Sequence, residues 1–255
     1  MMANFSMMRR RIWNAVSGCI RDVCAFMASC AAGGVLLWGL AACAHQSPPA
    51  GAGVAPSFMA RVETLALLQT FNADLLSHDS ATLTLERWCG AHRLASPARI
   101  TAERVSGEDK APTAQQRLEL GVTAAEPIRY RRVRLRCGAI VLSEADNWYV
   151  PARLTPDMNA QLDATDAPFG KVVQALHFRR HTLSSTLLWS PLPEGWEMHA
   201  AAAAAAGASG AATDAALRLP EYLLEHRAVL VLPDGTPFSE VVESYTGNVL
   251  AFPLP

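Results

Sequence analysis

The sequence predicts an α+β domain built on an antiparallel sheet. Two segments with helical spacing come first, and a pair of extended runs separated by a turn follows them. Two more helical segments come next, and further extended runs end the chain. Helices and strands are therefore grouped, which is typical of α+β architectures.

The first two helices are predicted from apolar spacing and from a break between them. Residues 61–76 repeat apolar side chains at three- and four-residue intervals, as an amphipathic helix does. Residues 77–80 interrupt the pattern, and Asp79 or Ser80 can cap a second helix. The apolar positions of the second helix are Leu83, Leu85, Trp88 and Cys89.

The central strands form a hairpin. Residues 99–105 predict a short strand, and the polar residues 107–116 predict a loop. Residues 128–137 and 140–150 are extended runs, and Gly138 with Ala139 between them is a hairpin signal.

The second half of the chain repeats these signals. Thr155 caps a helix that has Pro156 at its first position. Pro168, Phe169 and Gly170 lead into a further helix over residues 171–176. The remaining elements are a strand over 182–189, an Ala-rich low-complexity excursion over 198–217, and a hairpin of 226–232 with 237–245.

The start of the chain has the order of a secretory signal. Basic residues at 9–11 precede an apolar or small-residue run over 24–40. Leu40-Ala41-Ala42-Cys43 resembles the bacterial lipobox, in which the cysteine is lipidated. We therefore expect a lipoprotein signal peptide over 1–43, a flexible tether over 44–60 and one domain over 61–255. This predicts a lipid-anchored protein of the cell envelope that faces the periplasm, on the outer rather than the inner membrane. The alternative is a cytoplasmic protein that starts at Met59.

Composition excludes two classes of partner. Without residues 1–43 the chain has 18 basic and 22 acidic residues, which does not suit nucleic acid. There is no Cys-x-x-Cys or His-Glu-x-x-His motif, so we expect no metal site and no cofactor.

Cys89 and Cys137 are expected to be two partly buried thiols, with a disulfide as the alternative. We expect a monomer.

Five segments in order carry a resemblance to known proteins: residues 75–82, 131–135, 148–151, 168–170 and 235–243. Together they resemble the chorismate pyruvate-lyase family and its relatives, the effector-binding domains of bacterial transcription repressors. The resemblance covers about residues 65 to 252. It implies a six-stranded antiparallel sheet with helices on one face and an enclosed small-ligand cavity. The family converts chorismate to 4-hydroxybenzoate and pyruvate.

The resemblance also implies the substrate-binding residues. A family arginine that binds the ring carboxylate falls on Arg131 or Arg132. Because side chains alternate along a strand, Arg131 shares its face with Val133 and Leu135, whereas Arg132 lies on a face with other arginines. A cavity arginine needs apolar neighbours, which favours Arg131 and leaves Arg132 as the alternative. A backbone amide contact falls on Phe169 and Gly170, although the family usually has leucine where Phe169 stands.

A glutamate on the last strand is the family's catalytic residue, and here it falls on Glu243, with Glu240 as the alternative. A carboxyl group in a dry pocket could move the proton that the reaction requires. The predicted function is thus a chorismate lyase. The alternative is a non-catalytic envelope lipoprotein that binds a small aromatic carboxylic acid. The signal sequence favours the alternative, since chorismate is made and used in the cytoplasm.

Overall fold

The computed structural model describes residues 57–107, 109–199 and 217–252. All of them belong to one compact unit, Gly51–Pro255. A second unit, Met1–Ala50, lies outside the described residues, and so do the predicted signal peptide and Cys43.

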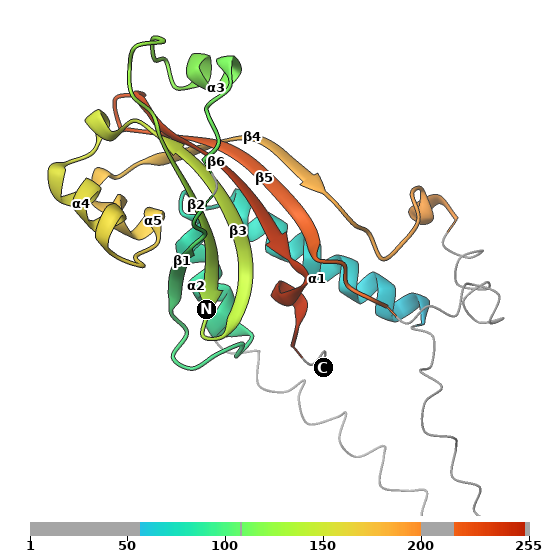
Figure 1. Ribbon diagram of the computed structural model, residues 1–255. Helices are drawn as coiled ribbons and strands as arrows, with labels where there is room; N and C mark the ends of the chain where they lie inside the picture. Colours follow the sequence, from blue (N-terminus) through green and yellow to red (C-terminus); the bar gives the residue numbers. More distant parts are fainter. Residues whose placement is uncertain (1–56, 108, 200–216, 253–255) are drawn as a thin grey trace, which may run out of the picture. The chain divides into compact units, whose positions relative to one another are not determined.

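A six-stranded, fully antiparallel sheet forms the centre of the unit (Figure 1). The strand order is β1-β2-β3-β6-β5-β4, so β1 and β4 are the edges. The strands are β1 (Ile100–Arg104), β2 (Arg129–Cys137), β3 (Ile140–Tyr149), β4 (Arg179–Leu187), β5 (Tyr222–Val231) and β6 (Pro237–Thr246). The predicted fold class, α+β with a six-stranded antiparallel sheet, is confirmed.

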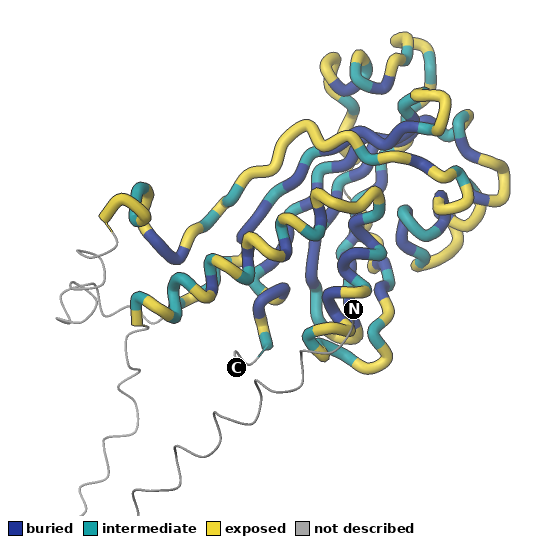
Figure 2. The backbone as a smooth tube through the Cα atoms, turned by 180° about the vertical axis from the view of Figure 1, so that it is seen from behind, coloured by how far each residue is buried: buried dark blue, intermediate teal, exposed yellow. Residues whose placement is uncertain are grey.

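Two longer helices, α1 (Phe58–Leu76) and α2 (Ala81–Ala91), cover one face of the sheet (Figures 1 and 2). Ser57 caps α1 and Ser80 caps α2, each through its side-chain oxygen. The buried ring of Phe71 lies 5.3 Å from that of Tyr245 on β6, measured between ring centroids. This contact belongs to the largest of the three apolar clusters among the described residues, which joins α1 and α2 to the sheet.

Shorter helices follow in the segments between β3 and β5 and near the end of the chain. Thr155 caps α4 (Pro156–Ala164), as predicted, and α5 (Phe169–Val172) is one short turn. Further single turns of 3-10 helix are Pro151–Arg153, Gln174–Leu176, Trp196–Met198 and Gly247–Leu250. The predicted helix over 171–176 is therefore divided into α5 and a 3-10 turn.

One short helix, α3 (Ala114–Glu119), packs on the other face of the sheet, where Leu120 contacts Trp148 and Val150. The prediction of a loop over 107–116 is partly wrong, because Thr113 and Gln116 form a capping box that starts this helix. Thr113 and Gln116 are polar, and polar residues without an apolar repeat indicate a loop.

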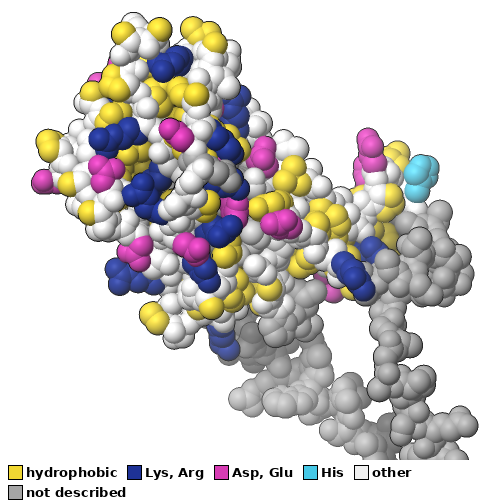
Figure 3. Space-filling view, viewed as in Figure 1, with side chains coloured by type: hydrophobic (Ala, Val, Ile, Leu, Met, Phe, Trp, Pro, Cys, Tyr) yellow, Lys and Arg dark blue, Asp and Glu magenta, His cyan; other side chains and the backbone are white. Residues whose placement is uncertain are grey.

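The alternation predicted for β2 is confirmed. Arg131, Val133, Leu135 and Cys137 are buried, and the arginines between them are half-buried or more exposed. The outer arginines form ion pairs, such as Arg132 and Arg134 with Glu144 at 2.9 and 2.8 Å. In Figure 3, basic and acidic side chains are intermixed on the visible face rather than gathered by sign.

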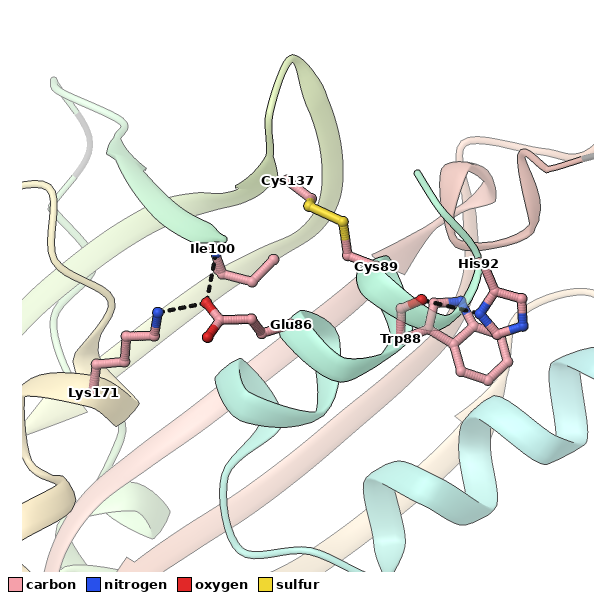
Figure 4. The surroundings of a disulfide bond; sticks show 7 residues. All are labelled: Glu86, Trp88, Cys89, His92, Ile100, Cys137 and Lys171. Atoms are coloured by element: carbon pink, nitrogen blue, oxygen red, sulfur yellow. Dashed lines mark hydrogen bonds and ion pairs between the residues drawn. A yellow bond between two sulfur atoms is a disulfide. The ribbon is translucent and has the colours of Figure 1, made fainter. Parts of the chain in front are cut away.

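Cys89 and Cys137 form a disulfide, so the expectation of two free thiols is wrong (Figure 4). The end of α2 lies beside the end of β2, which brings the two Cα atoms to 6.5 Å, within the usual range for a disulfide. Close by, the Glu86 carboxylate of α2 accepts hydrogen bonds from Lys171 of α5 and from the backbone N–H of Ile100 in β1. Burial opposes ionisation of Glu86, but these partners outweigh it and lower its pKa.

Candidate functional site

A small cavity of about 40 Å³ lies between the sheet and the starts of α2 and α5. Strands β2, β3, β5 and β6 form its floor, and residues just before and at the start of β4 close one side. Most of the lining is apolar, including Val133, Ala145, Phe169, Phe178 and Val241. Four charged residues also line it: Asp79, Arg131, Arg180 and Glu243.

Arg131 is buried in this cavity, and no described residue forms an ion pair with it. Its side chain projects from β2, and the residue is 4% exposed. Nη2 donates to the carbonyl oxygen of Ala167 at 3.1 Å, while Nε and Nη1 have no hydrogen-bond partner among the described residues. Burial, helped by the nearby positive charge of Arg104, lowers the pKa of Arg131 to about 10. A guanidinium in this state favours an anion as its partner.

Asn147 lies directly opposite Arg131 on β3. Its Oδ1 accepts a hydrogen bond from the Ser239 hydroxyl at 2.6 Å, which fixes the orientation of the amide. Its Nδ2 is buried and has no partner in the described part of the chain. Arg131 and Asn147 therefore present free donors side by side.

Arg180 and Glu243 form a buried ion pair at 2.6 Å, with side chains 4% and 8% exposed. The Tyr245 hydroxyl donates to the same Oε2 of Glu243 at 3.1 Å. Burial lowers the pKa of Arg180, but the Glu243 carboxylate outweighs it, and the pKa lies above its ordinary value. Burial raises the pKa of Tyr245, and Glu243 adds to that rise.

His226 supports this pair from β5, where it faces Glu243 across the β5–β6 ladder. It is fully buried, and its Nε2 lies 2.8 Å from Asn72 Oδ1 and 3.0 Å from Ser185 Oγ. Burial lowers the pKa of His226 to about 4; Glu243 opposes this shift and Arg180 adds to it. His226 is thus a neutral residue that connects α1 to the outer strands.

Gly170 permits the close approach of α5 to α2. A Cβ atom at this position would lie 3.0 Å from both Ser80 Oγ and Thr82 Oγ1. Phe169 beside it packs on Tyr149, with ring centroids 5.4 Å apart. These two residues therefore shape the wall of the cavity.

The structure brings four of the predicted site residues together in one cavity: Arg131, Phe169, Gly170 and Glu243. Arg132, the alternative to Arg131, projects to the other face, where it pairs with Glu144. Glu240, the alternative to Glu243, pairs with Arg227 at 2.8 Å and lies outside the cavity. The structure gives the positions of these residues, and their roles in binding and catalysis stay predictions.

Arg180 was missed in the sequence. The predicted strand began at Thr182, whereas β4 begins at Arg179. The register of β4 also shifts between Thr182 and Ser184, so alternation counted along the run does not give one face. The pair of arginines just before the strand was the signal that could have located it.

The described ranges contain neither a metal-binding cluster nor a membrane-spanning helix. No group of three or more His, Cys, Asp or Glu residues there is arranged to hold a metal ion. Among the helices of residues 57–107, 109–199 and 217–252, none is both long and apolar enough to cross a membrane.

No family model matches the sequence. The chain is 58% identical over 198 residues to the uncharacterized protein y4mC of Sinorhizobium fredii (strain NBRC 101917 / NGR234). The match covers 77% of this chain and 81% of y4mC. The chain therefore belongs to the same family as y4mC.

Solved structures resemble the described unit more distantly. The effector domain of PhnF from Mycobacterium smegmatis has a TM-score of 0.41 at 16% identity, over 67% of this chain and 90% of that one. A second PhnF structure from that organism has a TM-score of 0.43 at 15% identity and covers 69% of this chain and 67% of its own. A GntR-family transcriptional regulator from Enterococcus faecalis V583 gives 0.37 at 16% identity, over 60% and 99%. At these scores the likeness carries no inference about function.

Proposed function

We propose that this domain binds a small organic monocarboxylate, with the ligand carboxylate on Arg131 and Asn147. One observation carries the proposal. Among the described residues that line the cavity, the buried side-chain atoms without a hydrogen-bond partner are all N–H donors: Arg131 Nε and Nη1, Asn147 Nδ2 and Arg180 Nε. Buried donors need acceptors, and a carboxylate supplies two acceptor oxygens and a charge that complements Arg131.

The size of the cavity limits the ligand. Its volume of about 40 Å³ is enough for about three water molecules. An apolar cavity that accepts benzene measures about 150 Å³. An acid of three or four heavy atoms, such as formate or acetate, fits the cavity as it stands, and butyrate requires a small outward movement of its walls. The predicted small aromatic acid requires its walls, such as Phe169 and Phe178, to move outward.

Lyase activity is the second candidate, and the presence of Glu243 in the cavity favours it. Sheet spacings put the Cα atoms of Arg131 and Glu243 about 12 Å apart, at opposite corners of the cavity. A substrate bound to Arg131 by its ring carboxylate would direct its far end toward Glu243. However, the Oε2 atom of Glu243 already accepts from Arg180 and Tyr245. This arrangement suits a structural carboxylate better than a proton donor, so binding is the better supported function.

For location we propose the lipid-anchored envelope protein predicted from residues 1–43. The Cys89–Cys137 disulfide supports this, because disulfides persist in oxidising compartments outside the cytoplasm. Cys43→Ser should abolish labelling with a fatty-acid analogue and transfer the protein out of the detergent phase. A product that starts at Met59 and stays in the cytosol would contradict the proposal.

Calorimetric titration of the full chain with butyrate and 4-hydroxybenzoate tests the binding function. Arg131→Ala should weaken binding by about 2–5 kcal/mol, the usual cost of removing one partner of a buried charge pair. Arg134→Ala is the matched control, since this arginine lies on the opposite face of the same strand and is 42% exposed. Equal losses in both variants would refute the site.

Incubation of the full chain with chorismate, followed by detection of 4-hydroxybenzoate, tests the lyase function. Glu243→Gln should then reduce turnover by about 10²–10⁴-fold. Turnover that is unchanged in this variant would remove Glu243 from the mechanism.

A further inference from the structure

We propose that the Arg180–Glu243 pair makes the cavity selective for monoanions and excludes dianions. The inference rests on the proposed function, since it concerns the charge of the ligand that Arg131 binds. It assigns Arg180 and Glu243 a part in specificity.

The proposal begins with the charges buried in the cavity. Arg131 has no acidic partner among residues 57–107, 109–199 and 217–252, whereas Arg180 and Glu243 neutralise each other at 2.6 Å. The buried lining therefore carries one net positive charge. Asp79 is exposed at the rim, and its carboxylate accepts the backbone N–H of Arg180 at 2.9 Å. One anionic group on the ligand complements the net charge.

The arrangement in space determines what a second anionic group would meet. Arg131 and Asn147 lie on β2 and β3, whereas Glu243 lies on β6, with Ala145 and Val241 as its neighbours across and along the strands. A second carboxylate that extends away from Arg131 therefore approaches the carboxylate of Glu243. The lining is mostly apolar and both charged side chains are buried, so repulsion between like charges is stronger than in solution.

Arg180 cannot offset this repulsion while it remains paired. Its Nη2 donates to Glu243, and its Nε has no hydrogen-bond partner among the described residues. That Nε can donate to a neutral oxygen of the ligand, such as a hydroxyl or carbonyl group. The far end of the ligand is thus expected to be apolar or neutral and polar, but not charged.

A matched pair of four-carbon acids tests the proposal. Butyrate and succinate have the same chain length and differ in their second carboxylate. In calorimetric titrations of the full chain at pH 7, the native protein should bind butyrate at least about tenfold more tightly than succinate. Glu243→Gln keeps the shape of the side chain, removes its charge and frees Arg180, so this variant should bind succinate more tightly than butyrate. Glu225→Gln is the control on the neighbouring strand, and it should keep the native preference.

A double variant makes the test independent of how well Glu243→Gln folds. Arg180→Met with Glu243→Gln removes the repulsion by Glu243 without freeing Arg180, so the preference for butyrate should be weaker than in the native protein but not reversed. If the native protein binds butyrate but Glu243→Gln keeps the same ratio of butyrate to succinate affinity, the proposal that the pair selects charge is wrong and the binding function stands. If the double variant prefers succinate, Arg180 is not the residue that selects charge. If the native protein binds neither acid in a way that depends on Arg131, the proposed function itself fails.

Discussion

Arg131 and Arg180 are buried arginines of the same cavity, yet of the two only Arg180 pairs with a carboxylate of the described residues. Arg180 pairs with Glu243 at 2.6 Å, whereas Arg131 has two N–H groups without partners in the described part of the chain. A buried cation without a counter-ion destabilises a fold unless a ligand compensates for it. This contrast is the basis of the proposed function.

The disulfide should stabilise the domain. Cys89 and Cys137 are 48 residues apart, and closing a loop of this length contributes about 4 kcal/mol in the chain-entropy model. Changing both cysteines to serine should lower the free energy of unfolding by an amount of this order, measured by urea titration. A thiol reagent that labels Cys89 and Cys137 in unfolded, unreduced protein would show that the bond is absent.

His226 should make the domain less stable in mild acid. Its pKa lies near 4 in the folded protein and near 6.5 in the unfolded chain, so between these values the unfolded state binds more protons. Stability should therefore rise with pH from 4 to 6.5, by up to about 3 kcal/mol from this residue. Urea titrations at several pH values give the free energy of unfolding against pH. Between pH 4 and 6.5 this free energy should rise less steeply for His226→Gln than for the native protein. An identical slope would mean that His226 titrates normally.

Gly170→Ala should destabilise the contact between α5 and α2. The new methyl group would lie 3.0 Å from Ser80 Oγ, the cap of α2, and 3.0 Å from Thr82 Oγ1. We expect a loss of about 1–3 kcal/mol, typical of overpacking, together with weaker butyrate binding. Adding Thr82→Ala should recover part of the loss, because it removes one of the two contacts. No loss in the single variant would contradict the close approach.

Much of the fold follows from local signals in the sequence. Alternation along residues 131–137 predicted which arginine is buried, because a strand with one face on a core must present every second side chain to it. Thr155 with Pro156 predicted the start of α4 for an equally local reason. Signals of this kind depend on neighbours in the chain and are visible without the tertiary structure.

What could not be predicted depends on long-range contacts. The pairing of Cys89 with Cys137 requires the end of α2 to meet the end of β2, and no spacing in the sequence indicates that meeting. The ion pair of Arg180 with Glu243 likewise joins an edge strand to a strand two places away in the sheet. It could not be found while the start of β4 was placed after Arg180.

The most direct test of the account is the melting temperature of Arg131→Met, with and without butyrate. Replacing a buried, unpartnered cation by an apolar side chain of similar length should stabilise the ligand-free domain. One kcal/mol corresponds to about 2–4 °C for a domain of this size. The account predicts a melting temperature higher by at least about 2 °C, and no further rise when butyrate is added, whereas the native protein is stabilised by butyrate. A variant that melts lower than the native protein and still responds to butyrate would contradict the central claim that Arg131 is kept for a ligand carboxylate.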